Sequence, residues 1–184
     1  MHINENTIEQ ACIQALQGWG GAYTFGSEIE RERAEEVVLK SVLANAITRL
    51  NPQLPSNVVN DVVALVCKGD ITDLTERNQQ FYRLLREGVR VEYRENDEQK
   101  IDIVRLIDFQ NVHNNQFDVV NKFTIKGLKG NRRPDVICFV NGLPLVVFEL
   151  KIRLQNQPIC NRHFNSSKPI KQKLAISLFS IKPL

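Results

Sequence analysis

Apolar residues recur every three or four positions in four segments of the first half of the chain, which is the spacing of amphipathic helices. The predicted helices cover about residues 6–17, the segment 31–51 that stops before Pro52, and two shorter segments that end at Gly69 and Gly88. The second has the most regular pattern, with acidic residues in its first half and one apolar stripe formed by Val38, Val42, Ala46 and Leu50.

After Gly88 the pattern changes from helical spacing to alternation, which predicts β-strands. Strands are expected within residues 89–93, 100–109, 117–125, 134–140 and 143–151, and Asn141-Gly142 is a typical hairpin turn between the last two. The sequence therefore predicts one α/β (α+β) domain, in which a helical N-terminal half packs on a mixed sheet of about five strands.

Composition narrows the class of protein. With 184 residues and 42% hydrophobic residues, the chain is long enough for one sizeable core. It has no apolar run that reaches the length of a membrane span and no signal-peptide pattern at its start, so a cytoplasmic location is expected. The four cysteines show no C-x-x-C spacing, which favours buried reduced thiols over a zinc site or a disulfide framework.

Charge is distributed unevenly along the chain, whose net charge is +3. Residues 152–184 contain six of the 24 basic residues and none of the 21 acidic ones, so the first 151 residues carry 18 basic against 21 acidic side chains. The basic character of the chain therefore comes from its tail.

Three ionic residues flank the last two predicted strands. If Gly142 is the centre of the hairpin loop, Asp135 lies opposite Glu149 with Cβ atoms about 5 Å apart, and alternation puts Lys151 on the same face. Two carboxylates this close need a cation, and oxygen ligands without His or Cys suit Mg²⁺. A lysine beside a metal-bound water can orient it and stabilise the charge that develops during phosphodiester hydrolysis.

The alternative is a structural one, in which Asp135 ends a strand and Glu149 forms a solvated pair with Lys151. The motif P-D…E-x-K is short and arises often by chance. Its placement favours a site, because the charges lie at the ends of two apolar strands that have the pattern of buried ones.

Residues 114–151 resemble the nuclease core at the N-terminus of type I restriction enzyme R (motor) subunits, most specifically in "RRPD", "FVNG", "LPLVV" and "ELK". A looser likeness runs through "LTERNQQFYRLLREGV" and "IDFQN", so that it covers about residues 1–151. The resemblance implies a PD-(D/E)xK fold, Mg²⁺-dependent cleavage of double-stranded DNA, metal ligands at Asp135 and Glu149, and a catalytic lysine at Lys151. It also implies a supporting metal ligand on the first helix, at Glu9 or else Glu5.

Arg132 and Arg133 precede the candidate site. They are candidates for contacts with DNA phosphates, and surface solubilisation explains them equally well.

We expect the resemblance to end after Lys151, because residues 152–184 lack the acidic linker and the Q-x-x-x-Y helix of that family. If ordinary codons are chosen for residues 161–177 and read in a frame displaced by two bases, one possible translation contains Q-L-K-T-Y. We hypothesise that this tail is a frameshifted, unstructured continuation; a genuine basic tail that binds DNA is the alternative. No phosphate-loop motif GxxxxGK[ST] occurs, so ATP would serve only a full-length parent.

The resemblance thus implies that residues 1–151 are the incomplete nuclease domain of a type I restriction enzyme R subunit, whose intact parent is expected to cleave double-stranded DNA with Mg²⁺ and to work with methyltransferase and specificity subunits. Two alternatives remain open. One is a PD-(D/E)xK nuclease that acts alone, and the other is a non-catalytic DNA-binding or assembly module.

Overall fold

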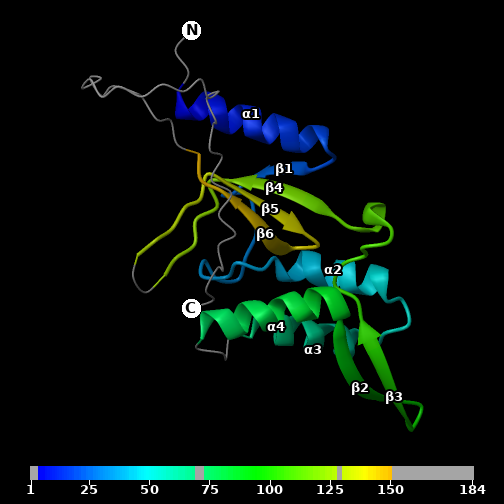
Figure 1. Cartoon of the computed structure of the whole chain (residues 1–184). Helices are drawn as coiled ribbons and strands as arrows, with labels where there is room; N and C mark the ends of the chain where they lie inside the picture. The colour runs from blue at the N-terminus through cyan, green and yellow to red at the C-terminus, as the bar shows by residue number, and fades with distance from the viewer. Residues whose placement is uncertain (1–3, 69–72, 128–129, 151–184) are drawn as a thin grey trace, which may run out of the picture.

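The computed structural model describes residues 4–68, 73–127 and 130–150 (Figure 1). Within them the helices are α1 (Glu5–Gly18), α2 (Lys40–Leu50), α3 (Ser56–Cys67) and α4 (Leu74–Glu87), with a short 3₁₀ turn at Val112–Asn114. The strands are β1 (Ala22–Phe25), β2 (Val89–Glu95), β3 (Glu98–Val104), β4 (Phe117–Asn121), β5 (Val136–Val140) and β6 (Leu143–Phe148). The α/β class is as predicted. None of the described helices is long and apolar enough to cross a membrane.

Four strands form the central sheet, in the order β1-β4-β5-β6. β1 is parallel to β4, and the β4–β5 and β5–β6 pairs are antiparallel, so the sheet is mixed as expected. The edge strand β1 was not predicted. It is only four residues long, and its side chains are mostly exposed, so it has little hydrophobic alternation that a sequence pattern could reveal.

The prediction of a single sheet of about five strands is wrong in one respect, because β2 and β3 form a separate two-stranded hairpin. The hairpin turns at Asn96 and Asp97, which both have positive φ angles. Its buried ends, Val89 and Val104, pack in a core cluster with α2 and α3. These contacts with the helices hold the hairpin apart from the central sheet.

Helix α2 starts later than the sequence pattern indicates, at Lys40. The preceding residues follow an irregular path that the Arg31 guanidinium holds, because it donates to the carbonyl oxygens of Glu36 at 3.0 Å and Thr124 at 2.9 Å. Backbone carbonyls bound in this way are not free to pair within a helix. The buried residues of α2 are Leu43, Ala46 and Ile47, so only Ala46 of the predicted stripe is fully buried in the helix.

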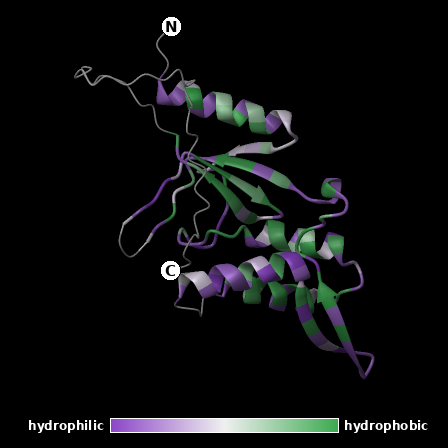
Figure 2. Ribbon diagram, in the orientation of Figure 1, coloured by the Kyte–Doolittle hydropathy of each residue, from purple (hydrophilic) through white to green (hydrophobic). Residues whose placement is uncertain are grey.

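Three apolar clusters join the helices and strands whose arrangement Figure 1 shows. One joins α1 to the sheet through Ile13, Val119 and Val136, and a second covers the opposite face around Phe123 and Phe139. The third joins α2, α3 and the hairpin. Figure 2 shows predominantly hydrophobic strands in the central sheet, whereas α4 is hydrophilic over much of its surface.

The β5–β6 turn controls where the ends of these strands meet. Asn141 and Gly142 both have positive φ angles, 51° and 78°, as a tight two-residue hairpin turn requires. Next to the turn Val140 pairs with Leu143, but a register shift after Cys138 makes Val136 pair with Phe148. The position of the turn was predicted correctly, but Gly142 is not the centre of the loop. The register shift gives the far end of the hairpin the pairing that a loop centred on Gly142 would have given.

Candidate functional site

Asp135 and Glu149 lie at the far end of this hairpin. One step beyond the last paired residues, Val136 and Phe148, the register brings Asp135 opposite Glu149. The backbone N–H of Leu150 donates to Oδ2 of Asp135 at 2.6 Å, which joins the two chain ends directly. The structure therefore brings the two predicted acids to neighbouring positions at one end of the sheet.

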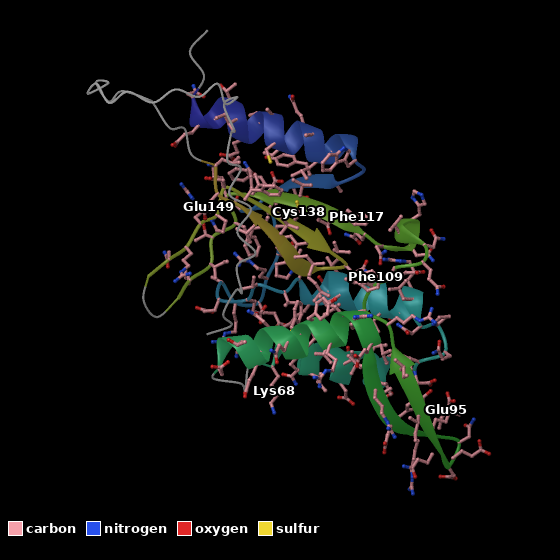
Figure 3. The ribbon with its side chains drawn as sticks, in the orientation of Figure 1. Lys68, Glu95, Phe109, Phe117, Cys138 and Glu149 are labelled. Carbon is pink, nitrogen blue, oxygen red and sulfur yellow. The ribbon has the colours of Figure 1, made fainter. Side chains whose placement is uncertain are left out.

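The two carboxylates differ in exposure. Asp135 is half-buried, in the bend between buried Pro134 and β5, and one of its oxygens is held by Leu150. Glu149 is exposed and follows the end of β6. Figure 3 shows Glu149 at one end of the sheet and Phe117, which starts β4, at the other. The arrangement offers two hard oxygen ligands at an accessible edge.

Lys151 lies outside the described residues. Its predicted position beside Glu149 stays a prediction. Within the described ranges, no three His, Cys, Asp or Glu side chains come together as a potential metal-binding group. A cation at this edge would thus rest on two carboxylates and on water.

Glu9 is the buried acid of α1. Its side chain is 6% exposed and faces β4, where Asn121 Nδ2 donates to Oε1 at 2.8 Å and Lys122 Nζ binds Oε2 at 2.5 Å. Glu5 is exposed in the first turn of the same helix. Of the two helix acids considered from the sequence, Glu9 is therefore the one that faces the sheet.

Lys122 was not recognised in the sequence as part of the site. It follows β4, and its backbone N–H donates to the carbonyl oxygen of Asp135 at 3.3 Å. A positive φ of 53° at Lys122 interrupts the strand, so both Asn121 and Lys122 reach Glu9 although neighbouring strand residues ordinarily face opposite sides. A charged residue inside the apolar run "FDVVNKFTI" was the available signal, since such a residue needs a partner.

Arg132 and Arg133 are both exposed, just before Pro134 and Asp135. Arg132 pairs with Ile125 through two backbone hydrogen bonds of 2.8 and 2.9 Å, which closes the connection between β4 and β5 into an antiparallel arm. The arginines are thus available to a ligand at the same end of the sheet as Asp135. Their contact with DNA stays a prediction.

Comparison with known proteins places the chain in a family. Residues 2–180 match the family described as "Type I restriction enzyme R protein N terminus". The chain belongs to this family. Its R-protein relatives include the type I restriction enzyme HindI endonuclease subunit of Haemophilus influenzae, with 47% identity over 181 residues, and the putative MjaIXP endonuclease subunit of Methanocaldococcus jannaschii, with 37% identity over 182 residues.

The two alignments cover most of this chain but little of the relatives. They include 94% and 92% of the chain, which spans only 17% and 18% of the length of these endonuclease subunits. The chain thus corresponds to one N-terminal part of an R protein. The family match continues past Lys151, where we expected the likeness to end, to residue 180. Residues 151–184 lie outside the described part of the structure, so the frameshift stays a hypothesis for the coding DNA to test.

Proposed function

We propose that this R-protein domain is an Mg²⁺-dependent nuclease of the PD-(D/E)xK class that cleaves double-stranded DNA within a type I restriction enzyme. The observations that support the proposal are the β5–β6 register, which one step beyond Val136 and Phe148 aligns Asp135 with Glu149, and the hydrogen bond from Leu150 to Asp135. The endonuclease names of the two relatives support the reaction class.

The chemistry of the donor set fits Mg²⁺. This ion takes oxygen ligands, is usually bound through one or two carboxylates, and keeps several waters. Asp135 has one oxygen committed to Leu150, which leaves the other for a ligand, and Glu149 is exposed to solvent. Bound there, the ion would supply Lewis-acid activation of water and of a phosphate oxygen. Glu9 already pairs with Asn121 and Lys122, so its negative charge is partly neutralised before any ion binds.

The protein groups would act on the substrate through charge and position. Lys151 follows Glu149 by two residues and would orient the attacking water, as the family resemblance implies. Arg132 and Arg133 would bind phosphates beside the scissile bond, because guanidinium groups pair with phosphate oxygens in a bidentate manner. Recognition of the DNA sequence and ATP-driven movement would belong to the remaining part of the R protein and to methyltransferase and specificity subunits.

Cation binding by the 184-residue chain tests the proposal. Asp135→Asn and Glu149→Gln should each weaken Mg²⁺ or Mn²⁺ binding by about 10-fold or more, measured by calorimetric titration, because each removes one anionic ligand. Asp61→Asn, which changes an exposed carboxylate on α3, is the matched control and should bind as the parent chain does.

Two outcomes would favour the alternatives. Cation affinity that neither site substitution changes would contradict the metal site and point to a DNA-binding or assembly module. Cleavage of supercoiled plasmid by the chain alone, lost in Asp135→Ala, would instead indicate a nuclease that acts without partner subunits.

A further inference from the structure

Lys122 lies at the end of the sheet that carries Asp135 and adds a positive charge there, beside the ion proposed for Asp135 and Glu149. The β4–β5 register pairs Asn121 with Val136, and the next step brings Lys122 opposite Asp135, as the 3.3 Å backbone hydrogen bond between them confirms. On the other side of β5 the same step brings Asp135 opposite Glu149. Lys122, Asp135 and Glu149 therefore form one row across three neighbouring chain segments.

The side chain of Lys122 is committed to Glu9. Nζ lies 2.5 Å from Oε2 of Glu9, whose side chain is 6% exposed, whereas that of Lys122 is 33% exposed. A carboxylate this deeply buried is unfavourable unless a positive group accompanies it. Lys122 supplies that group from a position that solvent still reaches.

The second oxygen of Glu9 is occupied as well. Asn121 donates to it through Nδ2 at 2.8 Å, and the Oδ1 atom of the same amide accepts from the Tyr23 hydroxyl at 3.0 Å. Tyr23 therefore determines which end of the Asn121 amide faces Glu9. An ammonium and an oriented amide together accompany the carboxylate, one on each oxygen, so a second cation would have to approach Glu9 beside the positive charge of Lys122.

From these contacts we propose that Lys122 is the resident cation of Glu9 and stands where a second divalent ion would otherwise bind. The site then takes a single divalent ion, at Asp135 and Glu149. Sites with two metal ions place one beside the attacking oxygen and one beside the leaving oxygen. Here a lysine ammonium supplies the second positive charge, so that charge does not depend on the concentration of ions in solution. This inference rests on the proposed nuclease function, because it assumes that Asp135 and Glu149 bind an ion.

Counting bound Mn²⁺ on the 184-residue chain tests the inference. The free ion is measured by electron paramagnetic resonance during titration. The parent chain should bind about one ion and Lys122→Gln about two, because the glutamine leaves Glu9 without a positive partner. The double variant Lys122→Gln/Glu9→Gln should return to about one ion. Lys122→Arg should keep about one, and Lys126→Gln, at an exposed lysine four residues further on, is the matched control.

The outcomes separate this inference from the proposed function. Two ions on the parent chain, or one ion on both the parent chain and a folded Lys122→Gln, would overturn the inference and leave the nuclease proposal standing. No ion on the parent chain would overturn both. If Lys122→Gln does not fold without cations, the count on the parent chain and on Lys122→Arg still decides, since two ions on either contradicts the inference.

Discussion

The backbone N–H of Leu150 donates a 2.6 Å hydrogen bond to Oδ2 of Asp135, across the end of the β5–β6 hairpin. This bond does two things at once. It fixes the orientation of a candidate metal ligand, and it holds the segment that carries Glu149 against the start of β5. Position of the site and local stability are therefore coupled through one carboxylate.

Replacing Asp135 should separate these two roles. Asp135→Ala should lower the free energy of unfolding by about 1–2 kcal/mol, because it removes a charged acceptor from a half-buried N–H group. Asp135→Asn keeps a hydrogen-bond acceptor, so its loss in the free energy of unfolding should be less than half of that in Asp135→Ala. Both variants should lose cation affinity. Urea denaturation followed by circular dichroism measures the difference. Equal stability of the alanine variant and the parent chain would show that the Leu150 bond contributes nothing.

Gly142→Ala should be strongly destabilising. The residue has a φ of 78°, and an added Cβ would lie 2.6 Å from the Leu39 carbonyl oxygen and 2.9 Å from the Leu43 nitrogen, both backbone atoms at the start of α2. Neither atom can move aside easily, so we expect a loss of about 2–4 kcal/mol in thermal or urea unfolding.

Gly18→Ala is the control for Gly142. It changes the last residue of α1, where an added Cβ meets nothing within 4 Å. Its effect should stay within about 1 kcal/mol and be neutral or stabilising, because alanine favours helix more than glycine does. Similar losses in the two variants would contradict the steric explanation.

Arg31→Lys should lower the free energy of unfolding by about 1–3 kcal/mol, although it keeps the charge. The guanidinium donates to the carbonyl oxygens of Glu36 and Thr124 and stacks with its Cζ atom 4.1 Å from the centre of the Phe123 ring, and a lysine ammonium cannot make these contacts together. Arg33→Lys, whose side chain is 74% exposed, should change stability by less than about 0.5 kcal/mol. Chemical denaturation of the two variants in parallel decides the matter.

Cys138 should make the stability of the domain fall at alkaline pH. Burial is the main cause that raises the pKa of this thiol from 9.0 to about 11, and nearby Cys12 adds to the shift. Between these two values the unfolded chain releases the proton and the folded chain keeps it, so unfolding becomes more favourable as pH rises from 9 toward 11.

Urea unfolding at pH 8 and pH 10 measures that dependence. The decrease in stability between the two pH values should be smaller in Cys138→Ala than in the parent chain. Part of it should remain, because burial also raises the pKa values of Cys12 and Cys67. Identical decreases in the two proteins would exclude Cys138 as a contributor.

Local patterns were sufficient for much of the fold. The helices α3 and α4 and the turn at Asn141-Gly142 were all predicted, since each depends on residues close together in the sequence. For the candidate site, the sequence pattern placed Asp135 opposite Glu149 on the assumption of a loop centred on Gly142. The structure has a different turn, and the register shift after Cys138 restores that alignment one step beyond the last paired residues.

Other features depend on contacts between distant segments. The late start of α2 follows from the contact of Arg31 with Thr124, 93 residues away, and the separation of the β2–β3 hairpin follows from packing against α2 and α3. The pairing of Glu9 with Lys122, 113 residues away, joins α1 to the end of β4. Neither the sequence around Glu9 nor that around Lys122 indicates this partner.

The sequence by itself determined the class of the domain and most of its elements, because hydrophobic periodicity and turn residues act over a few positions. Only the tertiary structure decided which charges meet. A buried carboxylate such as Glu9 takes whichever positive group the folded chain brings within reach, and that group, Lys122, is set by the packing of α1 on the sheet.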